Sequence, residues 1–380
     1  MAEQTTVVIG AGPAGLAVAA TLHARRIDPI VLEQGDAVGT SWRRRYDGLR
    51  LNTVRWLSNL PGLRMPRQAG RWVGRDEYVA YLERYAAHHR LRTRLGVRVE
   101  RIDPGPDETR RWLVSTDQEP IHASSVVVAT GAFATPVIPG WPGRSRFAGE
   151  LHHADSYRNP ARYAGRSVLV VGGGASGLEI ALLLAGGGAG PVLLSVRSCQ
   201  NLFVRQWRGI PLTPPPAAQR LPTAVLDAGG AMTRRLLGTG WPSPLPGAPA
   251  GLGTALRRDE REPTVADGVV EALRDGRIRL VAAVAELREQ EVVLADGEVV
   301  RPDAVIAATG YTDGLDTLVG HLGVTGPGGR LVAPAGQPIA HAPGLAFVGF
   351  TPTVTGRLLR LHSQARTAAR TITAPGKPQP

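Results

Sequence analysis

The stretch TTVVIGAGPAG at residues 5–15 decides the fold of this chain. Its apolar run over 5–9 predicts a strand, and the apolar run over 16–24 that follows the glycines predicts a helix. A second apolar run over 29–32 predicts the next strand. A glycine-rich turn set between a strand and a helix, with a further strand behind, is the sequence pattern of a dinucleotide-binding βαβ unit.

Each glycine of this turn has a separate task in such a unit. Gly10 permits the tight turn, Gly12 lets the backbone approach a pyrophosphate, and Gly15 allows the helix to pack closely on the strand. The helix N-terminus presents unpaired amides to an anion. We therefore expect the turn, including Pro13 and Ala14, to bind a nucleotide cofactor.

The second strand ends in Glu33, which is 18 residues beyond Gly15. A carboxylate at this place accepts hydrogen bonds from a ribose 2′-hydroxyl and repels a 2′-phosphate. The first turn is therefore expected to hold FAD or NAD rather than NADP, with Glu33 and its neighbour Gln34 among the contacts.

The same arrangement occurs again in mid-chain. A predicted strand over 167–171 leads into GGGASG at 172–177, an apolar helical run over 178–184 and a strand over 191–196. This repetition is stronger evidence than a single glycine-rich turn. The residues expected to contact the second cofactor are Gly172, Gly174, Ala175, Ser176 and Gly177.

The second unit ends in a base where the first ends in an acid. Arg197 follows the strand, and Arg205 lies downstream. A guanidinium suits bidentate contact with a 2′-phosphate, so the second turn is predicted to bind NADPH. The alternative for Arg197 is an ordinary solvated surface arginine.

Two further segments resemble each other. Strand patterns over 125–128 and 304–307 each lead into an Ala-Thr-Gly turn. Either segment alone would be interpreted as an ordinary turn after a strand. Because each accompanies a glycine turn, we expect both to approach a nucleotide or to form a domain crossing, through Thr130 and Gly131 in the first and Thr309, Gly310 and Tyr311 in the second.

Composition excludes several classes of function. The formal net charge is +12 over 380 residues, yet the arginines are scattered and Lys377 is the only lysine, which argues against nucleic acid as a partner. The single cysteine, Cys199, excludes an internal disulfide, a CxxC redox pair and a Cys-based zinc site. No metal motif, secretory signal or apolar stretch of membrane-spanning length is found, so we expect a cytoplasmic protein with neither metal nor membrane anchor.

The segment FAGELHHADSY at 147–157 fits the FxGxxxHxxxY fingerprint of flavin-dependent monooxygenases at Phe147, Gly149, His153 and Tyr157. The chain resembles the flavin-containing monooxygenases and the YUCCA enzymes, and more distantly the Baeyer–Villiger monooxygenases. The Baeyer–Villiger fingerprint ends in Trp followed by Pro or Asp, whereas here Tyr157 is followed by Arg158. The histidine is expected to be structural and to link the two nucleotide domains.

Other segments support the resemblance. Trp42 matches the family's flavin-shielding tryptophan, with a plain core residue as the alternative, and Gly349 lies in a segment similar to the last FAD-contacting strand. The stretch 196–205 is similar to the YUCCA pattern VRSxxHxxPR but has Asn201 for His and Val204 for Pro. Asn52 matches the family's asparagine beside the reactive edge of the flavin; its alternative is a turn cap.

The resemblance implies an NADPH- and FAD-dependent monooxygenase. In this family NADPH reduces FAD, and the reduced flavin adds dioxygen to give a flavin hydroperoxide that oxygenates a small molecule. The leading expectation is oxygenation of a nitrogen or sulfur in specialised metabolism. Asn52 is the expected catalytic neighbour, because a neutral amide both donates and accepts hydrogen bonds without protonating the peroxide.

Three alternatives remain open from the sequence. The enzyme could be a Baeyer–Villiger oxygenase, a YUCCA-like enzyme that oxidatively decarboxylates a 2-oxo acid, or a non-oxygenating NADPH-dependent flavin reductase or redox sensor. The lack of a CxxC argues against disulfide reductases only. The partners expected are a small-molecule substrate and O2, and the oligomeric state is open, with a homodimer as one alternative.

The expected fold is α/β, with two Rossmann-like dinucleotide-binding domains and the NADPH domain inserted in the FAD domain. The FAD domain is predicted over 1–145 and 290–380, and the NADPH domain over 146–289. The Pro- and Gly-rich stretch 212–253 is expected to be a solvated loop or a substrate-facing lid. A disordered tail is expected over 374–380.

Overall fold

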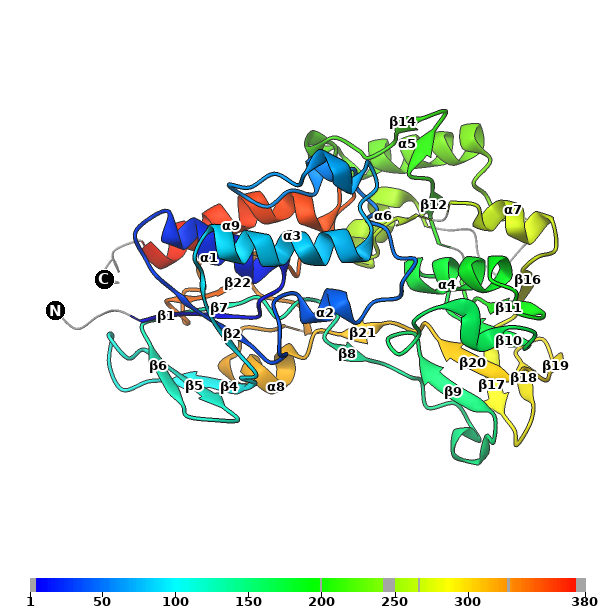
Figure 1. Cartoon of the computed structure of the whole chain (residues 1–380), viewed down its shortest axis with the longest axis horizontal. Coiled ribbons are helices and arrows are strands. Elements are labelled where there is room, and N and C mark those ends of the chain that lie inside the picture. The colour runs from blue at the N-terminus through cyan, green and yellow to red at the C-terminus, as the bar shows by residue number, and fades with distance from the viewer. Residues whose placement is uncertain (1–4, 199, 242–249, 266, 327–328, 374–380) are drawn as a thin grey trace.

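The computed structural model describes residues 5–198, 200–241, 250–265, 267–326 and 329–373. Within these ranges the chain forms two five-stranded parallel sheets that lie side by side (Figure 1). Each sheet carries helices on one face and a three-stranded antiparallel sheet nearby on the other. The α/β fold class and the two Rossmann-like units are confirmed.

The first sheet has the strand order β22-β7-β1-β2-β3, and every neighbouring pair is parallel. Helices α1, α3 and α9 pack over one face, and the β4-β5-β6 sheet with α8 covers the other. The bounds are β1 Thr6–Ile9, α1 Pro13–His23, β2 Ile30–Glu33, α2 Thr40–Arg43, α3 Arg75–His88, β3 Arg92–Leu95, β4 Val99–Pro104, β5 Trp112–Thr116, β6 Ile121–Ala123, β7 Ser125–Val128, α8 Leu315–Val319, β22 Leu345–Phe347 and α9 Arg357–Thr373.

The second sheet repeats this plan with the order β16-β11-β10-β20-β9, again all parallel. Helices α4 and α7 pack on one face, and the β17-β18-β19 sheet lies against the other. The bounds are β9 Glu150–His153, β10 Val168–Val171, α4 Ala175–Gly186, β11 Val192–Ser195, α7 Val269–Arg274, β16 Arg279–Val281, β17 Val284–Leu287, β18 Val292–Leu294, β19 Val299–Val300 and β20 Ala304–Ala307.

The two central strands show why these segments form buried parallel sheets. All four residues of β1, and all four of β10, are buried. A continuous apolar run is what a strand covered on both faces requires. Burial of each such valine or leucine side chain stabilises the fold by about 1.5–3 kcal/mol.

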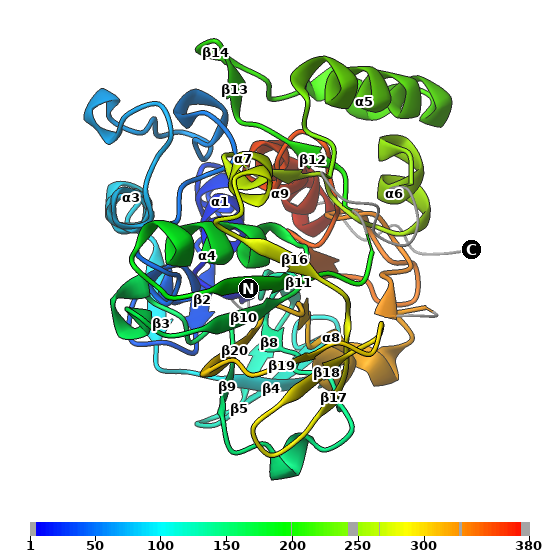
Figure 2. The ribbon, with the colours of Figure 1, turned by 90° about the vertical axis from the view of Figure 1, so that its right-hand side faces the viewer.

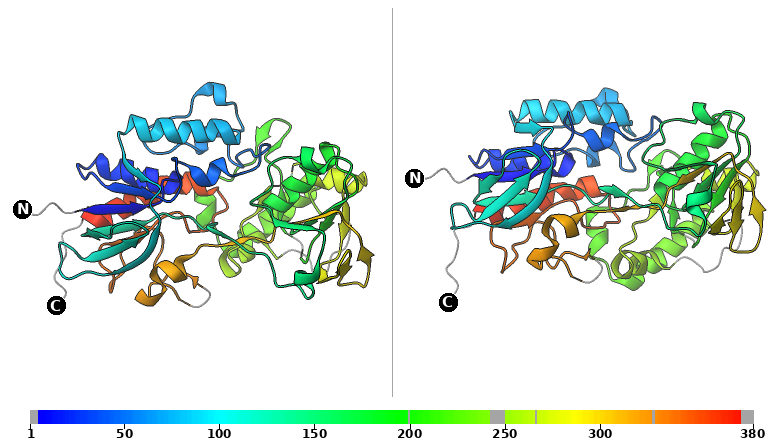
Figure 3. Two further views of the ribbon diagram at one scale, coloured as in Figure 1. Left: turned by 60° about the horizontal axis from the view of Figure 1, so that its bottom comes forward. Right: turned by 90° about the horizontal axis from the view of Figure 1, so that it is seen from below.

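The chain passes between the two halves twice, through short strands that pair antiparallel, β8 (Thr135–Pro136) and β21 (Tyr311–Thr312). Figure 3 shows these segments between the two halves. The predicted first boundary at 145 falls between β8 and β9. The predicted return at 290 is too early, because it separates β17 from its partner β18, and β20 still pairs with β10 in the second sheet.

The stretch 212–253 is not a plain loop in its described part. It contains α5 (Thr223–Leu237) and leads into α6 (Leu252–Arg258), which pack on each other at the edge of the molecule (Figure 2). Residues 242–249 and the predicted tail 374–380 lie outside the described residues. The remaining short strands of this region are β12 Leu202–Phe203, β13 Gln206–Trp207, β14 Ile210–Pro211 and β15 Thr264–Val265.

Candidate functional site: two nucleotide cradles and the cavity between them

The first glycine turn has the geometry that the sequence predicts. Gly10 has a φ of +103°, and a Cβ added at Gly15 would lie 1.8 Å from the Gly10 carbonyl oxygen. A side chain at either position would therefore strain the turn or push α1 away from β1. At Gly12, no described heavy atom would lie within 4 Å of an added Cβ, so the space in front of this backbone can accept a pyrophosphate.

The second glycine turn repeats this geometry. Gly172 has a φ of +130°, and a Cβ at Gly177 would lie 2.0 Å from the Gly172 carbonyl oxygen. A Cβ at Gly174 would meet nothing within 4 Å in the described part of the chain. Helices α1 and α4 both begin after glycine N-caps that offer no side-chain hydrogen bond, so their first-turn amides are free for an anion. Both turns thus fit a dinucleotide.

The Ala-Thr-Gly turns lie against the glycine turns, as their pairing in the sequence indicates. A Cβ at Gly10 would lie 2.7 Å from the Ala129 carbonyl oxygen, and one at Gly172 would lie 2.2 Å from that of Ala308. The Thr309 hydroxyl donates a hydrogen bond of 2.5 Å to the Val137 carbonyl, which ties the two crossing segments together. These turns therefore close the cradles and also form the crossing.

Glu33, which ends the first unit, and Arg197, which follows the last strand of the second unit, differ in their surroundings. Glu33 is buried, and its carboxylate accepts hydrogen bonds from the amides of Ala11 at 2.8 Å and Gly35 at 2.9 Å. This orients the carboxylate beside the first turn. Arg197 is exposed, two residues beyond the carboxyl end of β11 at Ser195. Its place in the fold suits a 2′-phosphate, and its role there stays a prediction.

A single cavity of about 1490 Å³ joins the two cradles. This volume exceeds that of a pocket for one drug-sized ligand, which is about 300–1,000 Å³. It is lined by most of the predicted cofactor-binding residues: Gly10, Gly12, Pro13, Ala14, Glu33, Gln34, Trp42, Thr130, Gly131, Gly174, Ala175, Ser176, Arg205, Gly310, Tyr311 and Gly349, together with Asn52 and His153. The others are not among the lining residues: Gly15, Gly172, Gly177, Arg197 and Thr309, and likewise the fingerprint residues Phe147, Gly149 and Tyr157.

His153, the fingerprint histidine, makes contacts that join β9 to the crossing. Its Nδ1 accepts a hydrogen bond from the Asp155 amide at 3.0 Å, so the proton of the neutral ring lies on Nε2, which donates to the Gly310 carbonyl at 3.0 Å. The ring also meets Tyr311 edge-on, with the centroids 4.8 Å apart. Burial lowers the pKa of His153, which favours this neutral form.

The other fingerprint residues are packing residues. A Cβ at Gly149 would lie 2.5 Å from the Phe147 ring, so the glycine leaves room for that ring. Tyr157 is buried and stacks on Tyr163 with the ring centroids 5.9 Å apart. The fingerprint therefore lies behind the cavity wall, apart from His153.

Trp42 and Asn52 come from the first half of the chain. Trp42 lies on α2, lines the cavity and packs edge-on against the buried Tyr78, with the centroids 4.5 Å apart. It is thus both a core residue and a wall of the site. The Asn52 side-chain oxygen accepts a hydrogen bond of 3.0 Å from Arg205, which comes from the other half.

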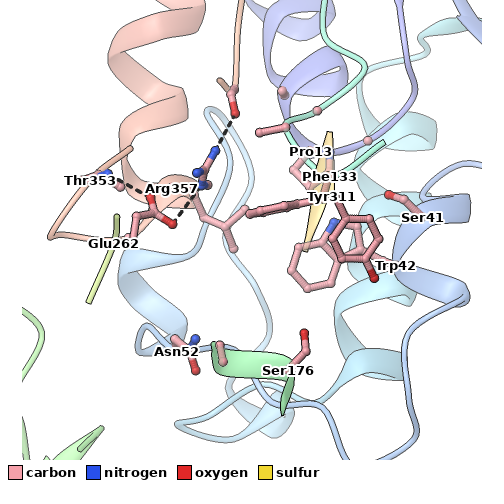
Figure 4. A pocket seen from close by; sticks show the side chains of 18 of the residues that line it. Pro13, Ser41, Trp42, Asn52, Phe133, Ser176, Glu262, Tyr311, Thr353 and Arg357 are labelled. Carbon is pink, nitrogen blue, oxygen red and sulfur yellow. Dashed lines mark hydrogen bonds and ion pairs between the residues drawn. The ribbon is translucent and has the colours of Figure 1, made fainter. Parts of the chain in front are cut away.

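The sequence does not reveal Glu262 and Arg357, which face the cavity in Figure 4. The Arg357 Nε donates to Glu262 at 3.0 Å, and the Thr353 amide donates to the other carboxylate oxygen at 2.9 Å. The guanidinium also lies 4.9 Å from the centre of the Phe133 ring. Arg357 begins α9 and lies outside every motif identified in the sequence, so nothing marks it in advance.

The described residues contain no group of three or more His, Cys, Asp or Glu side chains placed to hold a metal ion. Among those same residues, every helix is too short or too polar to cross a membrane.

The geometry defines a class of protein: an oxidoreductase fold with two dinucleotide cradles that open into one cavity. Residues 7–200 match the family model described as pyridine nucleotide-disulphide oxidoreductase. A cyclohexanone monooxygenase from Rhodococcus sp. Phi1, solved bound to NADP⁺, shares the fold with a TM-score of 0.72 at 21% identity, covering 97% of this chain and 84% of that one.

More similar sequences define the family. A rice protein (Oryza sativa subsp. japonica) named indole-3-pyruvate monooxygenase YUCCA1 is 35% identical over 310 residues, which are 80% of this chain and 76% of the relative. A flavin-containing monooxygenase from Stenotrophomonas maltophilia is 25% identical with a TM-score of 0.72, covering 98% of this chain and 99% of that one. The chain belongs to the flavin-dependent monooxygenase family, whose enzymes use FAD and NADPH.

Proposed function

We propose that this enzyme oxygenates a nitrogen or sulfur atom of an uncharged, largely apolar small molecule, an activity suited to specialised metabolism. The proposal rests on how the charges of the cavity are arranged. When bound, the reduced flavin activates dioxygen and NADPH supplies the hydride. The protein's own residues bind both cofactors, orient the substrate and exclude water from the cavity.

The observation that carries the proposal is the pairing of the half-buried arginines of the cavity. Arg45 lies 3.7 Å from Asp155, Arg205 pairs with Glu179 and Asp267, and Arg357 pairs with Glu262 at 3.0 Å. Breaking a desolvated pair to bind a substrate carboxylate leaves one carboxylate without its partner, which is unfavourable. An uncharged substrate leaves every pair intact.

The lid region supplies an apolar wall to the same cavity. Its lining side chains come from the segment before α5, from α5 itself and from α6, and they are Leu212, Leu221, Val225, Leu226 and Leu252, with Phe203 beside them. Apolar walls with a few placed polar groups are typical of small-molecule sites. The predicted lid role of 212–253 is part of this proposal.

Asn52 is proposed as the polar group beside the reacting oxygen. A neutral amide can donate a hydrogen bond there without releasing a proton. Its location on the cavity wall, near residues from both halves of the chain, supports this assignment.

Oxidative decarboxylation of a 2-oxo acid is the second candidate, because the rice relative is named an indole-3-pyruvate monooxygenase. Such a substrate needs a cation for its carboxylate. The exposed cavity arginines Arg44, Arg50 and Arg98 are the candidates in this chain. A Baeyer–Villiger reaction has weaker support, since the fingerprint continues from Tyr157 into Arg158.

The test is product analysis with the FAD-loaded enzyme, NADPH and O2. A thioether, a tertiary amine, indole-3-pyruvate and a cyclic ketone are supplied separately, and NADPH consumption, product mass and hydrogen peroxide are measured. We expect sulfoxide or N-oxide in near-stoichiometric yield on NADPH. Indole-3-acetate as the main coupled product would replace the proposal by the second candidate, a lactone would indicate the Baeyer–Villiger reaction, and peroxide with every compound would favour a reductase or sensor.

A further inference from the structure

Arg205 occupies the centre of a polar network that spans both halves of the chain. Its side chain is only 10% exposed. Nη1 and the backbone amide donate to the two oxygens of Asp267, each at 2.8 Å. Nη2 donates to Glu179 on α4, to the Asn52 side-chain oxygen at 3.0 Å, and more weakly to the Arg50 carbonyl at 3.3 Å.

These contacts decide which way the Asn52 amide faces. A guanidinium has donors only, so the atom of Asn52 that meets Arg205 must be its oxygen. The amide NH2 is then turned away from Arg205, and Figure 4 shows the Asn52 nitrogen on the side of the cavity interior. Asn52 therefore presents a hydrogen-bond donor to the cavity, and Arg205 holds it in that orientation.

The charge of Arg205 does not suit the 2′-phosphate contact that the sequence predicts for it. Two carboxylates, Glu179 and Asp267, surround one guanidinium, so the cluster carries an excess of negative charge. A phosphate dianion would be repelled by this excess. Arg197, by contrast, is exposed at the end of β11, where the ribose of the second nucleotide is expected.

The network is anchored at its far end by Tyr46. The Tyr46 hydroxyl donates to the second oxygen of Glu179. Burial, together with the Glu179 charge, raises the pKa of Tyr46, so the hydroxyl remains a donor. Asn52 and Tyr46 come from the first half of the chain, and Glu179, Arg205 and Asp267 come from the second.

We propose that Arg205 is a positioning residue that aims the Asn52 amide NH2 at the reacting oxygen, and that it does not select NADPH over NADH. The inference rests on the monooxygenase activity of the family and on Asn52 lying beside the reacting oxygen, and it is independent of the substrate. Loss of the aimed donor is expected to let reduced enzyme release hydrogen peroxide more readily.

The deciding variants are Asn52→Asp and Arg205→Met. Asn52→Asp keeps an acceptor for Arg205 but offers no NH2 donor. Without substrate, NADPH + H⁺ + O2 gives NADP⁺ + H2O2, and we expect both variants to form peroxide about tenfold faster, the effect of one lost hydrogen bond. Dissociation constants for NADP⁺ and NAD⁺, measured by calorimetry on the FAD-loaded proteins, are expected to keep their wild-type ratio.

Arg197→Met is the comparison for cofactor choice: it is expected to lower the NADP⁺ preference, whereas Arg205→Met is expected to keep that preference. The double variant Asn52→Asp/Arg205→Met is expected to be no worse than either single variant, because both remove the same donor. The proposal is overturned if Arg205→Met loses the NADP⁺ preference, or if Asn52→Asp forms peroxide at the wild-type rate. Should Arg205→Met fail to retain FAD, Arg205→Gln is measured in its place, with the same expected and contradicting results. Because substrate is omitted, a wrong substrate class would leave these outcomes unchanged.

Discussion

At the residue scale, the glycines of the two nucleotide-binding turns differ in what surrounds them. Gly12 and Gly174 leave open space in front of the backbone, whereas Gly15 and Gly177 are packed against a carbonyl oxygen of their own turn. Glycines of one motif therefore have two different roles. We propose that Gly12 and Gly174 serve ligand approach, whereas Gly15 and Gly177 serve helix packing.

Alanine at these positions should separate the two roles. Gly15→Ala puts a methyl group into the Gly10 carbonyl and is expected to lower the free energy of unfolding by about 1–3 kcal/mol, the usual cost of overpacking. Gly12→Ala meets no described atom and is expected to leave the stability of the FAD-free protein unchanged while weakening FAD binding. Thermal unfolding of the FAD-free proteins and the flavin absorbance of the purified ones give the two quantities. Equal losses of stability in both variants would contradict the division of roles.

At the scale of the element, α5 separates an inner wall from an outer face. Val225, Leu226 and Gly229 line the cavity, whereas Leu236 on the outer side is 74% exposed. Two adjacent glycines in the middle of α5 differ in their surroundings. A Cβ at Gly229 would meet no described atom within 4 Å, and one at Gly230 would lie 2.9 Å from Leu252 on α6.

Gly229→Leu is expected to fill part of the substrate space. The Michaelis constant for a bulky substrate should rise about tenfold, as if about 1.4 kcal/mol of binding were lost, while that for NADPH should not change. The helix itself should gain roughly 0.5–1 kcal/mol from loss of a glycine. Steady-state kinetics with substrates of increasing size provide the measurement.

Ala231→Leu is the matched control, since Ala231 is exposed on α5 and is not among the residues that line the cavity, so the Michaelis constants should stay at their wild-type values. An unchanged Michaelis constant for every substrate in Gly229→Leu would show that α5 does not border the substrate.

At the scale of the whole molecule, two similar halves are held together by the paired crossing strands and by the residues around them. His153 connects β9 with Gly310 and Tyr311 at the crossing. Tyr311 in turn accepts a hydrogen bond of 2.7 Å from Arg45 of the first half. This junction depends on a neutral imidazole, because the Asp155 amide needs Nδ1 as an acceptor.

The junction should make stability depend on pH. Burial lowers the pKa of His153, and also those of His152 and His89, below the unfolded value of about 6.5. Between the two pKa values the unfolded chain binds more protons than the folded one, so stability rises with pH and is lost as pH falls through about 6.5. The melting temperature should therefore fall between pH 7.5 and 5.5, and His153→Gln should reduce this fall. The exposed His122→Gln is the control, and equal pH dependence in His153→Gln and wild type would contradict the assignment.

The sequence by itself determined both nucleotide units and the family. Glycine spacing, the apolar runs beside it and the Ala-Thr-Gly turns are local patterns, because a strand, a tight turn and a helix start depend on neighbours within a few residues. The strands over 125–128 and 304–307 appear with the same bounds in the structure. The monooxygenase fingerprint is likewise contiguous, and the comparisons confirm the family that it indicates.

Only the tertiary structure decided what faces what across the cavity. Three features join segments that are far apart in the chain: the return crossing after β20, the contact of Arg205 with Asn52, and the pair of Glu262 with Arg357. Nothing in the sequence near Arg205 distinguishes an arginine that binds a phosphate from an arginine that is paired with Glu179 and Asp267. The reason is physical: the charge that a side chain offers to a ligand depends on which opposite charges are packed against it, and long-range packing supplies these.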